Sequence, residues 1–118
     1  MGYPQRYITP ATATPATDTL IRKGRTMLKG WYCYNLDAQA VFAHLYDAEA
    51  VGDVTPGVTV PKWTIAIPVN TTATNGSGAN AGGFNITFEL GMVIAVTKTL
   101  TGNVGAEVNT VLVNLETE

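Results

Sequence analysis

The sequence predicts an all-β fold, an antiparallel β-sandwich or barrel of jelly-roll or immunoglobulin-like type with an extended N-terminal arm. Apolar and polar residues alternate with a period of two in several segments, which is typical of strands with one buried face. Turn-forming residues separate these segments at intervals of about 8 to 14 residues, as in sandwiches and barrels. A chain of 118 residues is long enough for one core. We therefore expect one domain of six or seven strands.

The N-terminal segment, residues 1–19, is expected to be an extended arm outside the β-sandwich domain of residues 20–118. It contains three of the six prolines, and small Thr and Ala residues lie between them. Such a segment has too few large apolar side chains to form a core of its own. Two interpretations remain open: a frayed terminus, or an arm that becomes ordered across a neighbouring subunit.

Strands are expected where the alternation is regular. Residues 63–69 and 84–90 alternate most clearly, with a large apolar side chain at nearly every second position. Pro68 has no backbone N–H, so the first of these strands ends there or lies at a sheet edge. The pattern predicts further strands at residues 26–34, 92–98 and 108–115.

The connections carry residues that favour tight turns. Pro56-Gly57, Asn75-Gly76 and Thr101-Gly102-Asn103 supply the backbone dihedrals that chain reversals need. Residues 70–83 contain four glycines among Asn, Thr and Ser, and we expect one long flexible loop there.

Residues 37–50 fit two structures. Val41 and Leu45 have helical spacing, and Gly52 is a possible helix end. The same segment also alternates with a period of two, after a possible hairpin turn at residues 35–37. Its β-branched and aromatic residues favour the strand.

Charge and composition exclude several classes of function. Seven basic and nine acidic residues are scattered along the chain, so no basic patch is available for nucleic acid. Only 14% of the residues are charged, which favours self-assembly or docking, although a lightly charged monomer would look similar. The single cysteine, Cys33, cannot form an intramolecular disulfide and is expected to be buried. No membrane span or signal peptide is evident, so we expect a soluble protein made in the cytoplasm.

Few residues have the chemistry that catalysis requires. Ser77 lies in a Gly-rich loop that lacks the strand-to-helix elbow of a serine nucleophile. Cys33 and His44 would form a dyad only if their strands paired in register; we expect both to be packed structural residues instead. The loop at residues 75–83 is not followed by Lys-Ser or Lys-Thr, so phosphate binding is not expected. We expect no enzyme, no catalytic residue and no cofactor.

Three acidic residues lie close together in the sequence, Asp47, Glu49 and Asp53. Their oxygens are of the kind that calcium binds, but their spacing does not match a calcium loop. A solvated turn is the expectation, with no metal site.

The aromatic residues indicate packing or an interface. Trp31, Tyr32 and Tyr34 share one expected strand, and alternate side chains point to opposite faces of it. Trp31 and Trp63 are expected to pack in the core; a subunit interface and an open platform for stacking on sugars are the alternatives.

Five segments carry strand-and-turn motifs in a fixed order: WYCYN at 31–35, LYDA at 45–48, GDVTPG at 52–57, PKWTIAIP at 61–68 and FELGMVIAVT at 88–97. In this order they resemble small β-sandwich structural proteins of tailed bacteriophages. The resemblance covers residues 31–115, about seven-tenths of the chain. The loop at 70–83 and the Pro/Thr-rich arm depart from it and leave the docking mode open.

The resemblance implies a non-catalytic virion protein, a capsid decoration or cement protein on the capsid surface. Its expected partner is the major capsid protein, whose neighbouring subunits it would bridge as a homo-oligomer, a trimer, to stabilise the head. Neither nucleic acid nor membrane is an expected partner. The alternatives are a neck, tail or fibre component, or a carbohydrate-binding module for host attachment that uses Trp31 or Trp63.

Overall fold

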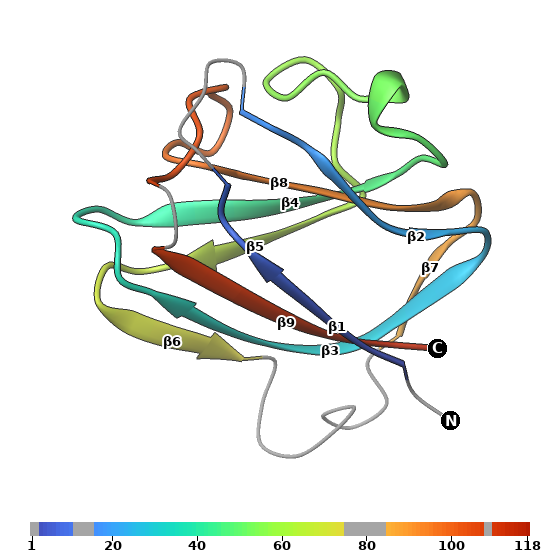
Figure 1. Cartoon of the computed structure of the whole chain (residues 1–118), viewed down its shortest axis with the longest axis horizontal. Helices are drawn as coiled ribbons and strands as arrows, with labels where there is room; N and C mark the ends of the chain where they lie inside the picture. Colours follow the sequence, from blue (N-terminus) through green and yellow to red (C-terminus); the bar gives the residue numbers. More distant parts are fainter. Residues whose placement is uncertain (1–2, 11–15, 75–84, 108–109) are drawn as a thin grey trace.

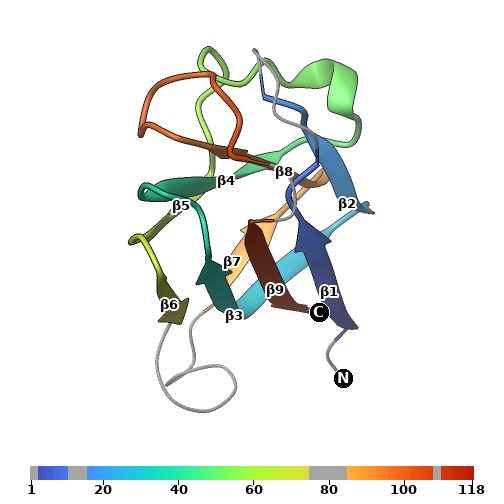
Figure 2. The same cartoon turned by 60° about the vertical axis from the view of Figure 1, so that its left-hand side comes forward.

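The computed structural model describes residues 3–10, 16–74, 85–107 and 110–118, which form a sandwich of two antiparallel sheets (Figure 1, Figure 2). The strands of sheet A are β1 (Tyr3–Ile8), β9 (Val111–Thr117), β3 (Thr26–Asn35), β6 (Thr71–Thr74) and β7 (Ile86–Phe88). Those of sheet B are β2 (Thr19–Lys23), β8 (Gly91–Thr97), β4 (Val41–Asp47) and β5 (Trp63–Ile67). A short 3₁₀ helix, η1 (Val51–Asp53), lies between β4 and β5. The predicted all-β sandwich is confirmed.

Of the two predicted fold types, jelly roll and immunoglobulin-like, the strand order matches the jelly roll. Sheet A runs β1-β9-β3-β6 and sheet B runs β2-β8-β4-β5. Strands at equal distances from the middle of the chain therefore pair with one another: β1 with β9, β2 with β8, β3 with β6 and β4 with β5. The chain is one long antiparallel ribbon whose successive pairs lie alternately in the two sheets, which is jelly-roll topology.

β6 and β7 extend along the same edge of β3. β6 pairs with the end of β3 at Tyr32 to Asn35, and β7 pairs with its beginning at Thr26 to Leu28. The two strands therefore behave as one edge strand that residues 75–85 interrupt. The expectation of a loop from residue 70 is wrong for β6, because its β-branched threonines suit a strand. The rest of the expected loop, with the Asn75-Gly76 turn and Ser77, lies outside the described residues.

The main core fills the space between the sheets. In β9, Val111, Val113 and Leu115 are buried and alternate with half-buried residues, as the period of two predicts. Leu28 and Phe88 are among the largest fully buried side chains of this core. Burial of one such side chain contributes about 1.5–3 kcal/mol, so this layer is the main source of stability.

A second, smaller cluster covers the outer face of sheet B; it contains Ala16, Tyr46, Ala48, Val54, Val93 and Ala95. β8 is therefore buried on both faces, and all seven of its residues are buried. This explains why its sequence is an almost continuous apolar run.

The predicted strands are present with changed bounds, and those expected at residues 63–69 and 84–90 are shorter than predicted. β5 ends at Ile67 directly before Pro68 and is an edge strand of sheet B, as predicted. The expected strand at residues 84–90 is wrong at its end, because β7 stops at Phe88 and Leu90 is exposed in the turn to β8. Val69 is exposed for the same reason, since it follows the end of β5.

The N-terminal segment is extended, but its described part belongs to sheet A. Tyr3–Ile8 form edge strand β1, which pairs antiparallel with β9 from Tyr3 and Thr117 to Ile8 and Leu112. An arm lying outside the sandwich is therefore not what these residues form. The division of the chain at residues 19 and 20 stays a prediction.

The ambiguous segment at residues 37–50 contains a strand, β4, as favoured, and not a helix. The hairpin expected at residues 35–37 is wrong, because β3 and β4 lie in different sheets and this connection crosses from one sheet to the other. Among the described residues, no helix is long and apolar enough to cross a membrane.

Candidate functional site

Three large aliphatic side chains project into solvent from loops over the outer face of sheet B. Val58 and Val60, in the β4–β5 connection, are 77% and 86% exposed, and Leu100, in the β8–β9 connection, is 59% exposed. We call these three residues the aliphatic loop patch. Single exposed apolar residues are ordinary, but several together on neighbouring loops are typical of an interaction surface.

The loop that carries the two valines is fixed by its own hydrogen bonds. The Thr55 carbonyl accepts from the N–H groups of Val58 and Thr59, both at 2.9 Å, and the Thr55 N–H donates to the Thr59 hydroxyl at 2.8 Å. Gly57 has a φ of +88°, as the predicted Pro56-Gly57 turn requires. The turn that presents Val58 is therefore preformed, and Val60 follows it directly.

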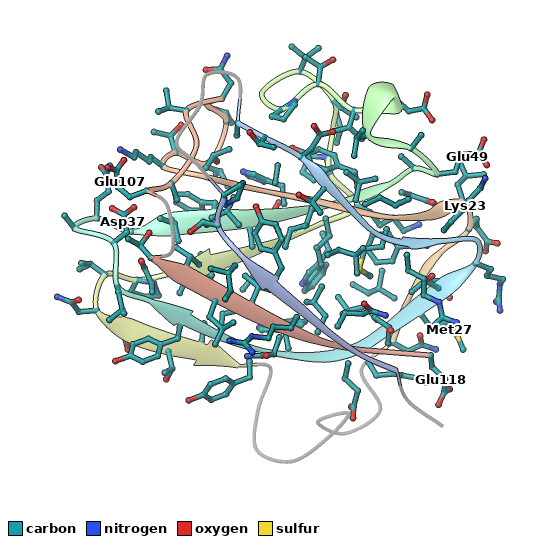
Figure 3. The ribbon with its side chains drawn as sticks, viewed as in Figure 1. Lys23, Met27, Asp37, Glu49, Glu107 and Glu118 are labelled. Atoms are coloured by element: carbon teal, nitrogen blue, oxygen red, sulfur yellow. The ribbon has the colours of Figure 1, made fainter. Side chains whose placement is uncertain are left out.

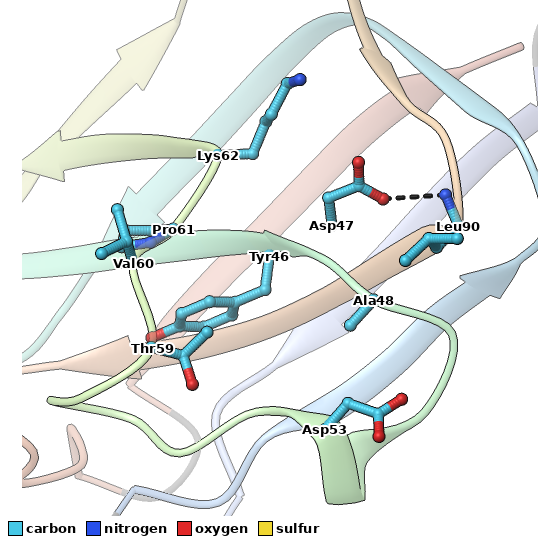
Figure 4. Close-up of a pocket in the computed structure, with 9 residues that line it drawn as sticks. All are labelled: Tyr46, Asp47, Ala48, Asp53, Thr59, Val60, Pro61, Lys62 and Leu90. Carbon is cyan, nitrogen blue, oxygen red and sulfur yellow. Dashed lines mark hydrogen bonds between the residues drawn. The ribbon is translucent and has the colours of Figure 1, made fainter.

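A hollow of about 390 Å³ lies on one side of this loop (Figure 4). Its walls include the apolar side chains of Val60 and Leu90, together with the charged side chains of Asp53 and Lys62. Asp47 also lines it, but the carboxylate of Asp47 accepts the N–H groups of Glu89 and Leu90 at 3.1 and 2.8 Å. Asp47 thus stabilises the β7–β8 turn.

A second hollow, of about 250 Å³, lies on the other side of the same loop. His44 and Tyr46 contribute to it, and the three residues of the aliphatic loop patch lie around it. None of its lining residues is Asp, Glu, Lys or Arg. Such a hollow suits an apolar side chain better than an ion or a charged ligand.

His44 is almost fully buried on the outer face of sheet B. Its Nε2 lies 2.8 Å from the Thr97 hydroxyl, which itself donates to the Thr99 carbonyl; Nε2 therefore carries the proton and donates. Nδ1, 3.1 Å from the Thr64 hydroxyl, is left to accept. Burial lowers the pKa of His44 below 6.5, so the neutral ring is the stable form.

The Cys33 and His44 dyad does not form. Cys33 is buried in the main core between the sheets, whereas His44 lies on the far side of sheet B. Burial raises the pKa of the Cys33 thiol to about 12, which leaves it protonated and unreactive. Cys33 is buried as predicted. Ser77 lies outside the described residues.

The acidic residues weighed as an ion site are spread over β4 and the following turn. The oxygens of Asp47 are engaged by backbone N–H groups, and Glu49 and Asp53 are exposed. Within the part of the chain that the structure describes, no three His, Cys, Asp or Glu side chains are grouped as metal ligands.

Trp31 and Trp63 pack against each other at the edge of the main core, as expected for core tryptophans. Their ring centroids are 5.8 Å apart and the ring planes are inclined by 51°. Both side chains are half-buried, and each ring has the other as a packing partner. Tyr32 and Tyr34 point to the opposite face of β3 and are exposed.

The aliphatic loop patch was not identified from the sequence. A signal was present, since two valines flank a threonine in a segment otherwise rich in turn residues, between Pro56 and Pro61. Their exposure depends on the route of the β4–β5 connection over sheet B, which local patterns do not determine. The arrangement offers an apolar surface to which a protein partner can bind.

No family model matches the chain, and no curated protein matches it. Among solved structures, a chain from a study of Bacillus endospore appendages, described as a family of disulfide-linked pili, is 13% identical with a TM-score of 0.45; the match covers 98% of this chain and 83% of that one. The Tobacco streak virus coat protein is 9% identical with a TM-score of 0.39, over 97% of this chain and 85% of that one. Similarity this low carries no argument about function.

Proposed function

We propose that this chain is a non-catalytic structural protein of a bacteriophage virion, a capsid decoration or cement protein that docks on the outer capsid through the aliphatic loop patch. The observation that carries the proposal is the patch itself, because Val58, Val60 and Leu100 are exposed to water on neighbouring loops, and hydrogen bonds to Thr55 preform the turn that carries Val58. The sequence resemblance to virion proteins supplies the setting, and the major capsid protein is the partner.

The proposed contact has a simple physical basis. A preformed loop loses little conformational entropy on binding, so more of the energy of apolar burial appears as affinity. A cement protein contacts several capsid subunits at once and is repeated over the shell, so modest contacts add up by avidity. A lightly charged surface suits this role, because each copy lies against neighbours.

The test is co-sedimentation of purified variants with capsid particles that lack this chain. Burial of one valine contributes about 1.5–3 kcal/mol, so Val60→Lys is expected to weaken binding about tenfold to a hundredfold. Val58→Lys is expected to act in the same direction. The matched control is Val69→Lys, because Val69 is also an exposed valine but lies outside the patch.

Two results would count against the proposal. Equal binding of the Val60→Lys and Val69→Lys variants would remove the patch as the docking surface. Failure of the wild-type chain to bind heads, with binding to necks, tails or fibres seen by electron microscopy, would move the protein to that part of the virion. A sugar-binding module is disfavoured by the packed Trp31 and Trp63 rings, and a glycan array provides the direct check.

A further inference from the structure

The two outer faces of the sandwich are covered differently. The outer face of sheet B is covered by the second cluster, to which the loop residue Val54 and the connecting residue Ala16 contribute. Sheet A has no such cover among the described residues, because neither hydrophobic cluster includes a side chain from its outer face. Within the described part of the chain, the outer face of sheet A therefore carries exposed side chains.

Large apolar side chains line part of that face. Leu112 is opposite both Ile8 and Tyr34 in the strand register, so these three form one row across β1, β9 and β3. Tyr32 lies two residues before Tyr34 in β3, and Leu36 directly follows β3, so these two residues flank the row on either side of Tyr34. Ile8, Tyr32, Tyr34 and Leu36 are 42%, 52%, 42% and 57% exposed. We call these five residues the sheet A face.

The charges around this surface are balanced. On the same side of sheet A, Arg6 lies in the row of Tyr32, and Glu116 lies in the next row away from Leu112. Lys29 and Glu118 form an ion pair of 3.8 Å beyond them. Figure 3 shows Glu118 at the opposite end of the sandwich from Asp37, which follows Leu36. Two basic and two acidic residues thus sit toward one end, with the apolar row toward the other.

We propose that two copies of this chain associate through the sheet A face, sheet against sheet, about a two-fold axis. A two-fold contact needs only one patch that is complementary to itself. Two sheets can pack face to face, about 10 Å apart, through the side chains of their facing surfaces. Because each copy presents both signs of charge, two identical faces do not repel each other, and each charge can meet its opposite.

Edge-to-edge pairing is a poor alternative for the same two copies. Pro4 removes a backbone donor from β1, and a register irregularity between Leu20 and Arg22 disrupts β2. The two-fold pair differs from the trimer that the sequence resemblance implies, since a ring of three needs two different surfaces that meet. It is also independent of docking on a capsid.

The test is the mass of the purified chain in solution, measured by light scattering over a concentration series. The wild type is expected to have the mass of two chains. Tyr34→Lys and Ile8→Lys are expected to weaken association at least tenfold, while Val60→Lys keeps the wild-type mass. Leu112→Thr is a milder variant that preserves strand propensity, and thermal unfolding verifies that each variant is folded.

A cross-linking experiment locates the contact. A short bis-maleimide is expected to join copies of the Tyr34→Cys variant, but not copies of Val60→Cys or of the wild type, whose single cysteine is buried. A wild-type mass of one or three chains would overturn the proposal. So would an unchanged mass for Tyr34→Lys and Leu112→Thr, or equal cross-linking of the Val60→Cys variant. None of these results depends on binding to particles, so the two proposals can fail separately.

Discussion

Replacement of Asn35 by alanine is expected to destabilise the sandwich strongly, because this fully buried amide joins the two sheets. Asn35 is the last residue of β3 in sheet A. Its Nδ2 donates to the carbonyls of Gln39, Ile67 and Pro68, each at 3.1 Å, and the last two lie at the end of β5 in sheet B. Its Oδ1 accepts the N–H of Asp37 at 2.7 Å.

The expected loss in the free energy of unfolding is estimated from the polar groups that Asn35→Ala leaves without a hydrogen-bond partner. The hydrogen bonds to Ile67 and Asp37 are both buried, and each buried polar group left unpaired costs about 1–3 kcal/mol. Partial entry of water reduces the total, so we expect a loss of about 2–4 kcal/mol in the free energy of unfolding. At about 4 °C per kcal/mol, the melting temperature falls by about 8–16 °C.

The assay is equilibrium unfolding in urea, followed by the fluorescence of the half-buried tryptophans. The matched control is Asn114→Ala, since Asn114 also donates to a backbone carbonyl, that of Tyr32 at 3.2 Å, but in an exposed setting. The control is expected to change stability by no more than about 0.5 kcal/mol. An Asn35→Ala variant as stable as the Asn114→Ala variant would refute the reasoning.

Three further changes test other parts of the structure by the same unfolding assay. Burial lowers the pKa of His44 in the folded chain, so below about pH 6.5 the unfolded chain binds more protons than the folded chain. The free energy of unfolding is therefore full above that pH and falls as the pH drops toward the pKa of the folded state. His44→Gln is expected to remove this pH dependence. Asp47→Ala frees two N–H groups of the β7–β8 turn and costs about 1–2 kcal/mol, against almost nothing for Asp53→Ala. Gly91→Ala places a Cβ 2.7 and 2.8 Å from two backbone oxygens at a φ of +152° and costs more than about 3 kcal/mol, whereas Gly52→Ala meets nothing within 4 Å.

Most strands that sequence reasoning found have two faces with contrasting surroundings, although β8, which was also found, is buried on both faces. β9 is the clearest case, because Val111, Val113 and Leu115 all face the main core. β2 escaped notice because its register shifts between Leu20 and Arg22, which disrupts the alternation. β1 contains a proline and β6 is only four residues long, and such edge strands gain their stability from neighbours distant in sequence, which local patterns do not encode.

The candidate docking surface was less predictable than the fold. The sequence correctly indicated that Cys33 is buried and that the tryptophans pack, since both follow from residue type. His44 lies on the outer face of sheet B, and Val60 is exposed on a loop over that face. Both positions depend on which face of sheet B is turned to the core and on which face the loops cross. That choice is made by the jelly-roll topology as a whole.

Assembly through the aliphatic loop patch and the sheet A face predicts how binding and self-association depend on salt concentration. The edges of the described sheets are poorly suited to pairing with another chain, owing to Pro4 in β1, the irregular register of β2, Pro68 after β5 and the break between β6 and β7. Contacts through the aliphatic loop patch and the sheet A face would rest mainly on apolar burial, which salt does not screen. Particle binding and self-association should therefore persist at high salt and weaken in the cold. Release at high salt, with no effect of cooling, would show that charge pairs hold the assembly and that both surfaces have been misassigned.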